Sequence, residues 1–328
     1  MTFSPWYYRI FDICIGSTFP LHGLEPCEGK EAKLHVEFIP DGFEEDRYEW
    51  LHSWKAEDQK VLLDYARVGS AYVLRFPSLA GFLIDFNQMQ VWCYPLGSSG
   101  QNTVAHLLAD QVIPRMLSHL GRVTMHASAV QSPDGRIAAF LGPSGQGKST
   151  LAAFFHREGW PLLSDDCLLF EEKQGRVVGI PAYPSLRLWT DSQEELYTED
   201  DLGLHEFKPM AEYSDKKQVI LGTKFTCADF APKEIAALFL LNTIGEESDA
   251  GDVFISPAPG AEAIISMMKS LFALDVISSG AAANNFELIG KIAQSNLPIS
   301  QLNFPLEYKK LPYVLQAVKH YFGGDRPY

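Results

Sequence analysis

The sequence has few cysteines and no long apolar run. Five cysteines occur in 328 residues, and no two of them form a Cys-x-x-Cys pair. This odd and scattered set gives little support to a zinc framework or to a disulfide-stapled fold. Apolar runs such as 235–241 are far shorter than the roughly 18 residues that span a bilayer. No export signal with a cleavage site is present near the N-terminus. We therefore expect a cytoplasmic protein that does not bind a membrane.

Basic residues are also in short supply. The chain has 27 Lys and Arg against 41 Asp and Glu, a formal net charge of −14. Proteins that bind a nucleic-acid backbone need a basic face, so a nucleic-acid partner is not expected. The charge balance leaves room for one small phosphate ligand held by a few local groups. With 46% hydrophobic and 21% charged residues, the composition is that of a folded globular protein.

The pattern along the chain changes near residue 120. Before it, β-branched and aromatic runs between Gly, Pro and Asp breaks predict strands at 7–14, 33–38, 71–76, 81–85 and 90–94. Residues 103–120 have a helical apolar stripe, in which Pro114 should produce a kink or a break. After residue 120, strand-like and helical segments alternate, which is typical of an α/β layer. We predict a β-rich N-terminal domain with a linking helix over 1–120 and an α/β domain over 121–328.

Two acidic segments are harder to interpret. Residues 41–58 are predicted to be helical in part, and residues 191–215 to form a loop-rich insertion or flap. Later elements are clearer, with a strand at 235–241 and helices near 261–274, 281–294 and 313–321.

Residues 142–150, Gly-Pro-Ser-Gly-Gln-Gly-Lys-Ser-Thr, fit the pattern G-x-x-x-x-G-K-[ST]. An apolar strand-like run precedes them and a helical run follows, which is the context that this phosphate-binding loop (P-loop) requires. Glycines let backbone N–H groups curl around a phosphate, and the helix N-terminus adds positive potential. Lys148 would reach the β- and γ-phosphates and Ser149 would ligate Mg²⁺. The predicted nucleotide-binding residues are Gly142, Ser144, Gly145, Gln146, Gly147, Lys148, Ser149 and Thr150.

Adjacent carboxylates follow soon after this loop. Asp165 and Asp166 end an apolar run that begins at Trp160. Near Mg²⁺ and a γ-phosphate, one carboxylate suits a metal ligand and the other a proton acceptor for an attacking hydroxyl. Asp166 is a predicted Mg²⁺ ligand together with Ser149, although which aspartate takes which role stays open. The alternative is an Asp-Asp turn that caps the next segment.

Two further residues are candidates. If the strands on either side of the turn 132–135 pair with Gln131 opposite Arg136, His126 faces Leu141 beside the loop entrance. A histidine there can touch phosphate or assist proton transfer. The alternative interpretation, a half-buried histidine in a strand without a role in the site, is equally favoured. Arg187 could contact a phosphate or the acceptor, but a surface cation is slightly favoured.

Four features follow one another along the chain: Met125-His126-Ala-Ser-Ala-Val, the hairpin, the loop 142–150 and Leu163-Ser-Asp165-Asp166. In this order they resemble the catalytic domain of HPr kinase/phosphorylase. That bacterial serine kinase is itself distantly similar to phosphoenolpyruvate carboxykinase. The resemblance covers roughly residues 120–190, and by position it implies roles for the loop, His126, Asp165 and Asp166. Thr150 stands where those enzymes carry a glutamate, and their C-terminal signature stretch is not found. The chain looks more like divergent HPr-kinase-like proteins, including those encoded with lasso-peptide pathways.

The resemblance implies a kinase that uses ATP and Mg²⁺ to phosphorylate a serine or threonine of a protein or peptide, such as a ribosomally made precursor peptide. The HPr enzymes form hexamers, so a homo-oligomer is an expectation by analogy. Two alternatives stay open: a non-catalytic ATP-sensing regulatory protein, and a small-molecule kinase of the same fold.

Overall fold

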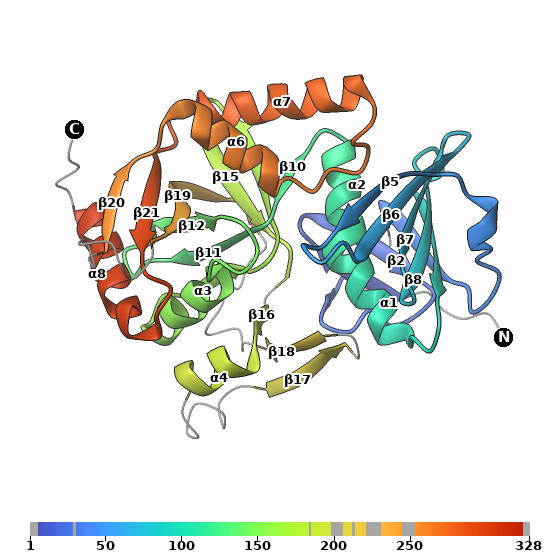
Figure 1. Cartoon of the computed structure of the whole chain (residues 1–328), viewed down its shortest axis with the longest axis horizontal. Coiled ribbons are helices and arrows are strands. Elements are labelled where there is room, and N and C mark those ends of the chain that lie inside the picture. The colour runs from blue at the N-terminus through green and yellow to red at the C-terminus, as the bar shows by residue number, and fades with distance from the viewer. Residues whose placement is uncertain are drawn as a thin grey trace. The chain divides into compact units, whose positions relative to one another are not determined.

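The computed structural model describes residues 6–28, 31–183, 185–197, 206–211, 214–220, 231–244 and 253–323. Within these residues the chain divides into two compact units (Figure 1). The first contains the chain up to Leu120, together with 209–215 and 273–283. The second contains 121–208, 216–272 and 284–328. Both units have a large sheet, and the chain is a mixed α/β protein.

The sheet of the first unit has nine strands in the order β3-β1-β2-β4-β9-β8-β7-β6-β5. Its strands are β1 (Trp6–Ile10), β2 (Ile13–Ser17), β3 (Glu25–Pro26), β4 (Leu34–Phe38), β5 (Trp50–Lys55), β6 (Val61–Val68), β7 (Ala71–Phe76), β8 (Ala80–Asp85) and β9 (Gln90–Pro95). The strands predicted at 33–38, 71–76, 81–85 and 90–94 are confirmed. The single strand predicted at 7–14 is wrong, because Phe11 adopts a positive φ of 52° and turns the chain from β1 into β2.

The helix predicted at 103–120 is interrupted. It consists of α1 (Gln101–Leu107), a π-helical turn η2 (Leu108–Val112) and α2 (Ile113–His119). Pro114 follows this π-helical turn at the start of α2, and the wider turn accommodates a residue that has no N–H to donate to the preceding helix. The predicted break is therefore confirmed, and it takes the form of a π-helical turn.

The second unit is built around a sheet in the order β10-β14-β15-β19-β12-β11-β13, with β21 beside β19 and β20 beside β21. Strand β19 runs parallel to both β12 and β21, and the other pairs are antiparallel. The strands are β10 (Val123–Met125), β11 (Ala127–Gln131), β12 (Ile137–Leu141), β13 (Leu162–Ser164), β14 (Leu168–Lys173), β15 (Arg176–Pro181), β19 (Lys233–Thr243), β20 (Phe254–Pro257) and β21 (Ile299–Phe304). The helices are α3 (Lys148–Arg157), α4 (Thr190–Leu196), α6 (Gly260–Ser270), α7 (Ser279–Ala293), the short 3-10 helix η4 (Tyr308–Lys310) and α8 (Leu311–Gly323).

Helices cover both faces of this sheet, because its central strands are apolar on both sides. Phe140 of β12 belongs to a buried cluster with α3 and α8. Its neighbour Leu141 belongs to a second cluster with α6 and α7. Successive side chains of a strand point to opposite faces, so this near-continuous apolar run gives a three-layer arrangement (Figure 1).

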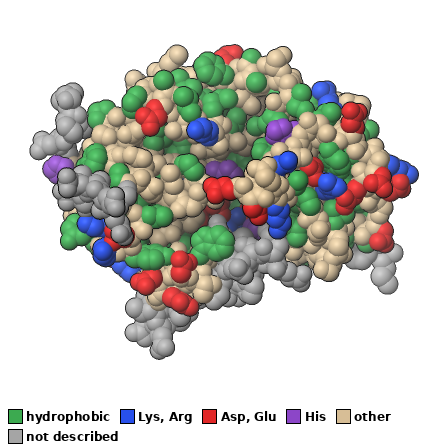
Figure 2. Space-filling view, viewed as in Figure 1, with side chains coloured by type: hydrophobic (Ala, Val, Ile, Leu, Met, Phe, Trp, Pro, Cys, Tyr) green, Lys and Arg blue, Asp and Glu red, His purple; other side chains and the backbone are tan. Residues whose placement is uncertain are grey.

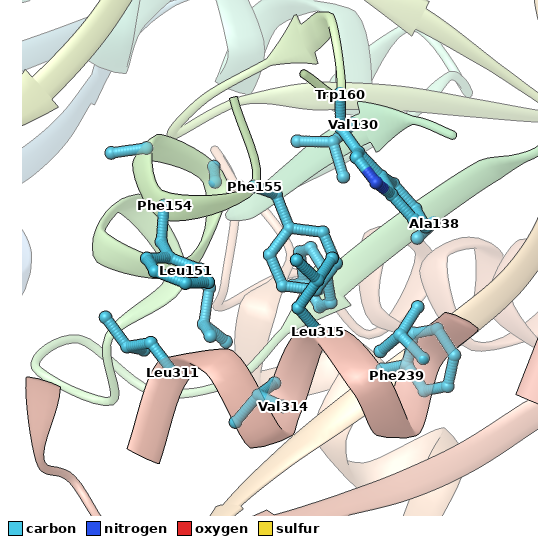
Figure 3. Packing of buried hydrophobic residues seen from close by; sticks show 14 of the residues in the cluster. Val130, Ala138, Leu151, Phe154, Phe155, Trp160, Phe239, Leu311, Val314 and Leu315 are labelled. Atoms are coloured by element: carbon cyan, nitrogen blue, oxygen red, sulfur yellow. The ribbon is translucent and has the colours of Figure 1, made fainter. Parts of the chain in front are cut away.

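The first of these clusters fixes the helix that follows the glycine-rich loop. Leu151, Phe154 and Phe155 of α3 pack against Leu311 and neighbouring residues of α8 (Figure 3). Phe155 is fully buried, and its ring lies edge-on to those of Phe140 and Trp160, with centroid distances of 5.4 and 5.0 Å. The start of α3, and with it the loop, is therefore held on a rigid core.

Replacing Phe155 by alanine should lower the free energy of unfolding by about 3–5 kcal/mol, since it leaves a cavity among aromatic rings. Chemical denaturation followed by circular dichroism would measure this loss. Phe286→Ala is the matched control, because that ring is 57% exposed on α7 and its loss should cost less than about 0.5 kcal/mol. Equal losses in both variants would show that the cluster does not stabilise the fold.

Both acidic segments contain more regular structure than predicted. Within 41–58 lie a short 3-10 helix η1 (Glu45–Arg47) and strand β5. Residues 191–215 include most of α4, strand β17 (Glu206–Ala211) and the start of β18 (Ser214–Ile220), which pairs with β16 (Ser185–Leu188). In these parts the prediction of a loop-rich segment was wrong, because the buried face of α4 consists largely of polar residues, Ser192 and Gln193 beside Leu196. Residues 198–205 and 212–213 of the predicted segment lie outside the described residues.

The surface mixes the side-chain types. On the face shown in Figure 2, acidic side chains lie among basic and hydrophobic ones. Of the helices that the structure describes, none combines the length and apolar character needed to cross a bilayer.

Candidate functional site

The glycine-rich loop connects β12 to α3, as predicted. Gly145 and Gly147 have φ values of 84° and 82°, a left-handed conformation that glycine adopts without strain. Gly147 is also the N-cap residue of α3, and a Cβ there would come within 3.1 Å of Leu306 Cδ1. The loop therefore leads directly into the N-terminal end of a ten-residue helix, where N–H groups lack helical partners and the dipole favours an anion.

Lys148 is buried beneath this loop. Its Nζ donates to Gly142 O at 2.8 Å and to Pro143 O at 3.0 Å. The Oε1 of Gln146 is buried without a hydrogen-bond partner, and it lies 2.8 Å from where a Cβ on Gly142 would stand. The ammonium group thus sits at the loop centre, bonded to carbonyls that an anion could replace as its partner.

A cavity of about 290 Å³ opens beside the loop, entirely within the second unit. Its lining includes Ser144, Gly145, Gly147, Lys148, Ser149 and Thr150 from the loop, Asp166 and Arg187 on one side, and Trp189, Asp191, Ser192, Leu306, Glu307 and Tyr308 on another. The structure therefore brings together most of the predicted nucleotide-binding residues with one of the two aspartates.

The adjacent aspartates have different surroundings. Asp165 is 3% exposed; its Oδ1 accepts from Ser128 Oγ at 2.6 Å and its Oδ2 from the backbone N–H of Arg187 at 3.0 Å. Asp166 follows at a φ of 61°, a left-handed conformation uncommon outside glycine, and its side chain lines the cavity. One carboxylate is anchored inside the protein and the other faces the space beside the loop.

Arg187, on β16, is buried rather than a surface cation. It is 5% exposed, its Nη1 donates to Asp166 Oδ2 at 3.3 Å, and its guanidinium lies over the ring of Tyr183. The reading of this residue as an exposed charge was therefore wrong. Its side chain places positive charge on the cavity wall next to Asp166.

Replacing Ser128 by alanine should lower the free energy of unfolding by about 1–3 kcal/mol, because it removes a donor to a buried carboxylate. Urea denaturation at neutral pH would measure the change. The exposed Ser98 serves as control, and Ser98→Ala should lie within about 0.5 kcal/mol of the parent protein. A Ser128→Ala protein as stable as the parent would contradict an anchoring role for Asp165.

The predicted register of the 124–141 hairpin was wrong by one residue. Gln131 pairs with Ile137, so Ala127 and not His126 lies opposite Leu141. The reason is a three-residue turn closed between Ser132 and Arg136, with Gly135 at a φ of 91°.

His126 lies between β10 and β11 rather than within one continuous strand. Its N–H donates to Ser270 O at 2.8 Å, and its ring centroid is 3.8 Å from that of Phe272. It is not among the described residues that line the cavity. Phosphate contact or proton transfer by His126 remains a prediction from the sequence, without support from this cavity.

Along one part of the cavity lining, starting at Thr150 of the loop, four polar side chains form a connected series that no sequence pattern groups together. Thr150 Oγ1 lies 3.3 Å from Ser192 Oγ, which lies 3.0 Å from Tyr308 Oη, and Tyr308 donates to Asp191 Oδ2 at 3.2 Å. Burial raises the pKa of the Tyr308 hydroxyl above its ordinary value, and the charge of Asp191 raises it further. The hydroxyl therefore remains a proton donor at neutral pH.

The sequence alone gives only an indirect indication that Asp191, Ser192 and Tyr308 lie together. Ser192 and Asp191 lie in the segment expected to be irregular, and Tyr308 is more than a hundred positions from both. Recognising the buried face of α4 would have been needed to place them.

Oxygen donors suited to Mg²⁺ are present, but not as a preformed cage. Ser149 and Asp166 line the same cavity. Among the described residues, no group of three or more His, Cys, Asp or Glu side chains lies close enough to hold a metal ion. Mg²⁺ is usually held by one or two protein oxygens together with waters and substrate phosphates, and Ser149 and Asp166 are the cavity residues that would supply them.

Comparison with known proteins gives little further information. No family model matches the sequence, and no curated protein matches it. Among solved structures, the Hpr(Ser) kinase/phosphatase from Coxiella burnetii is similar over 61% of this chain and 97% of its own, with 12% sequence identity and a TM-score of 0.32. Because this likeness is weak, the functional argument below rests on the geometry of the site.

Proposed function

We propose that the chain is an ATP- and Mg²⁺-dependent kinase that transfers the γ-phosphate to a serine or threonine hydroxyl of a protein or peptide. The observation that carries this proposal is a shared cavity. It places Lys148 and the amides at the start of α3 beside the Asp166–Arg187 pair. Phosphoryl transfer needs such a set, because catalysis consists mainly of positioning and of neutralising phosphate charge.

Each cavity group has a defined part in this proposal. Lys148 leaves the carbonyls of Gly142 and Pro143 to bind the β- and γ-phosphates, with the loop amides. Arg187 neutralises charge on the transferred phosphoryl group. The acceptor oxygen forms a bond to the γ-phosphorus while the bond from that phosphorus to the bridging oxygen breaks, releasing ADP. The proton of the acceptor hydroxyl passes to Asp166.

Asp165 does not touch the reactants in this scheme. Its two oxygens accept from Ser128 and from the backbone of Arg187, so it fixes the chain on both sides of the cavity wall. It is a positioning residue that holds Asp166 in its left-handed conformation. Arg187 donates to Asp166 Oδ2 and thereby orients this carboxylate in the cavity.

Ser149 would hold the Mg²⁺ that accompanies ATP, with the carboxylate of Asp166 in the same cavity. Bound there, the ion would neutralise charge on the β- and γ-phosphates. The acceptor class follows from the resemblance of residues 120–190 to serine kinases, and a homo-oligomer remains an expectation by the same analogy.

The test is transfer of label from γ-labelled ATP with Mg²⁺ to HPr, to peptides encoded by neighbouring genes and to proteins of a host lysate. Mass spectrometry would locate the modified residue. A phosphoserine or phosphothreonine that forms only with the active protein would support the proposal. Tight ATP binding with no transfer to any acceptor would contradict it and favour an ATP-sensing protein.

A further inference from the structure

The part of the cavity lining formed by Trp189, Asp191, Leu306 and Tyr308 has no part in phosphoryl transfer as described above, yet it combines polar and apolar groups. Tyr308 and Asp191 offer a hydroxyl and a carboxylate, 3.2 Å apart. Trp189 and Leu306 offer large apolar side chains that are 50% and 57% exposed while lining the same cavity. A cavity lined by apolar surface with a few convergent polar groups is typical of a small-molecule site.

The direction of a bound triphosphate follows from the loop. Lys148 reaches the β- and γ-phosphates in this class of loop, so the α-phosphate lies further along, at the first residues of α3. Thr150 is at that end, because it is the third residue of the helix. The group esterified to the α-phosphate must therefore lie beyond Thr150.

The side chains next to Thr150 are those of Ser192, Tyr308 and Asp191. The Oγ1 of Thr150 is 3.3 Å from Ser192 Oγ, and the series continues through Tyr308 Oη to Asp191 Oδ2 with spacings of 3.0 and 3.2 Å. Asp191 is exposed at the rim, where its carboxylate can accept hydrogen bonds from a sugar. This length of polar surface next to the α-phosphate position suits a ribose with its two hydroxyls.

Trp189 lies close in sequence to Asp191, the last residue of this polar series. Trp189 directly precedes α4, two residues before Asp191, and the backbone there enters the helix with an extended conformation. Leu306 comes from the segment between β21 and η4, and Tyr308 is the first residue of η4. An indole and a branched aliphatic chain in one cavity provide flat and apolar surface on which a base can stack.

We propose that Trp189, Leu306, Tyr308 and Asp191 form a nucleoside-binding subsite that takes the base and the ribose of a ribonucleoside triphosphate. Trp189 and Leu306 hold the base by stacking and apolar contact. Asp191 and Tyr308 hydrogen-bond the ribose hydroxyls. This inference rests on the proposed function, because that proposal places the triphosphate on the loop.

The experiment compares Mg²⁺ complexes of ATP, 2′,3′-dideoxy-ATP and inorganic tripolyphosphate by isothermal titration calorimetry. In the parent protein, ATP should bind more tightly than tripolyphosphate. Trp189→Ala should weaken ATP about 5- to 100-fold, the range expected for loss of base stacking, and leave tripolyphosphate within about twofold. Asp191→Ala should weaken ATP and leave dideoxy-ATP unchanged, since that ligand has no ribose hydroxyls to bind.

Two further variants test whether the loss of ATP affinity is specific to the proposed nucleoside subsite. Leu306→Ala tests the apolar contact without altering the start of α4, and it should weaken ATP but not tripolyphosphate. Phe254→Ala removes a ring that is 43% exposed on β20 and outside the cavity lining, so it should change neither affinity. Circular dichroism would verify that each variant is folded.

The subsite is overturned if Trp189→Ala and Leu306→Ala leave ATP affinity unchanged, or if they weaken ATP and tripolyphosphate equally. It is also overturned if the parent protein binds tripolyphosphate as tightly as ATP, a result that leaves triphosphate binding at the loop intact. If the parent protein binds neither ligand, the proposed function fails together with the subsite.

Discussion

Replacing Lys148 by alanine is expected to lower phosphoryl transfer by about 10²–10³-fold, the usual loss when one preorganised group that stabilises transition-state charge is removed. The ammonium group is buried at the centre of the loop, 2.8 Å from Gly142 O, so nothing else in the described part of the loop carries a positive charge to that position. The loss should fall on kcat and on ATP affinity together. Label transfer from γ-labelled ATP, with a full titration of ATP, would measure both.

A matched control separates this effect from a general loss of positive charge. Lys319 is exposed on α8, away from the cavity lining, and Lys319→Ala should retain the activity of the parent protein. If Lys148→Ala transferred phosphate at the parental rate while folded, the loop would not be the site of transfer.

Asp166→Asn is expected to lower kcat by about 10²–10⁴-fold, which is the typical contribution of a positioned proton acceptor. Asparagine has nearly the same shape and tolerates the left-handed backbone that Asp166 adopts, so the substitution removes the charge and leaves the chain in place. Because Asp166 would also help Ser149 to hold the Mg²⁺ that accompanies ATP, the affinity for the Mg²⁺ complex of ATP should fall as well, but by less than kcat. Single-turnover transfer and calorimetric titration would separate kcat from binding.

The neighbouring residue provides the comparison. Asp165→Asn puts an amide between two donors, Ser128 Oγ and the N–H of Arg187, so one contact becomes donor against donor. We expect this variant to lose stability as well as activity, whereas Asp166→Asn should retain parental stability. Parental transfer rates in Asp166→Asn would contradict the assignment of the proton acceptor.

The parts of the fold that were predicted correctly depend on local pattern. Strands such as β7 and β9 are runs of β-branched and aromatic residues between breaks, and they were placed within a residue or two. The position of the loop between β12 and α3 follows from the spacing of Gly142, Gly147 and Lys148 after a five-residue apolar run. In each case the residues that form the pattern and the element that they form lie within about 15 residues of one another in the sequence.

The parts that were missed depend on contacts between distant segments. The difference between Asp165 and Asp166 is made by Ser128 and by the backbone of Arg187, which come from other strands. The burial of Arg187 has the same origin, since its neighbours Leu186 and Leu188 on β16 belong to the buried cluster that includes α3. The register of the 124–141 hairpin was set by the length of its turn, and a single residue there moved His126 away from Leu141.

The most direct test of triphosphate binding at the loop is a crystal structure of the protein with Mg²⁺ and a non-hydrolysable ATP analogue. The β- and γ-phosphates should lie on the backbone amides at the start of α3, and Lys148 Nζ should have left Gly142 O to bind them. Asp166 and Arg187 should then face the γ-phosphate. An analogue bound elsewhere, with Lys148 still donating to Gly142 and Pro143, would contradict the account.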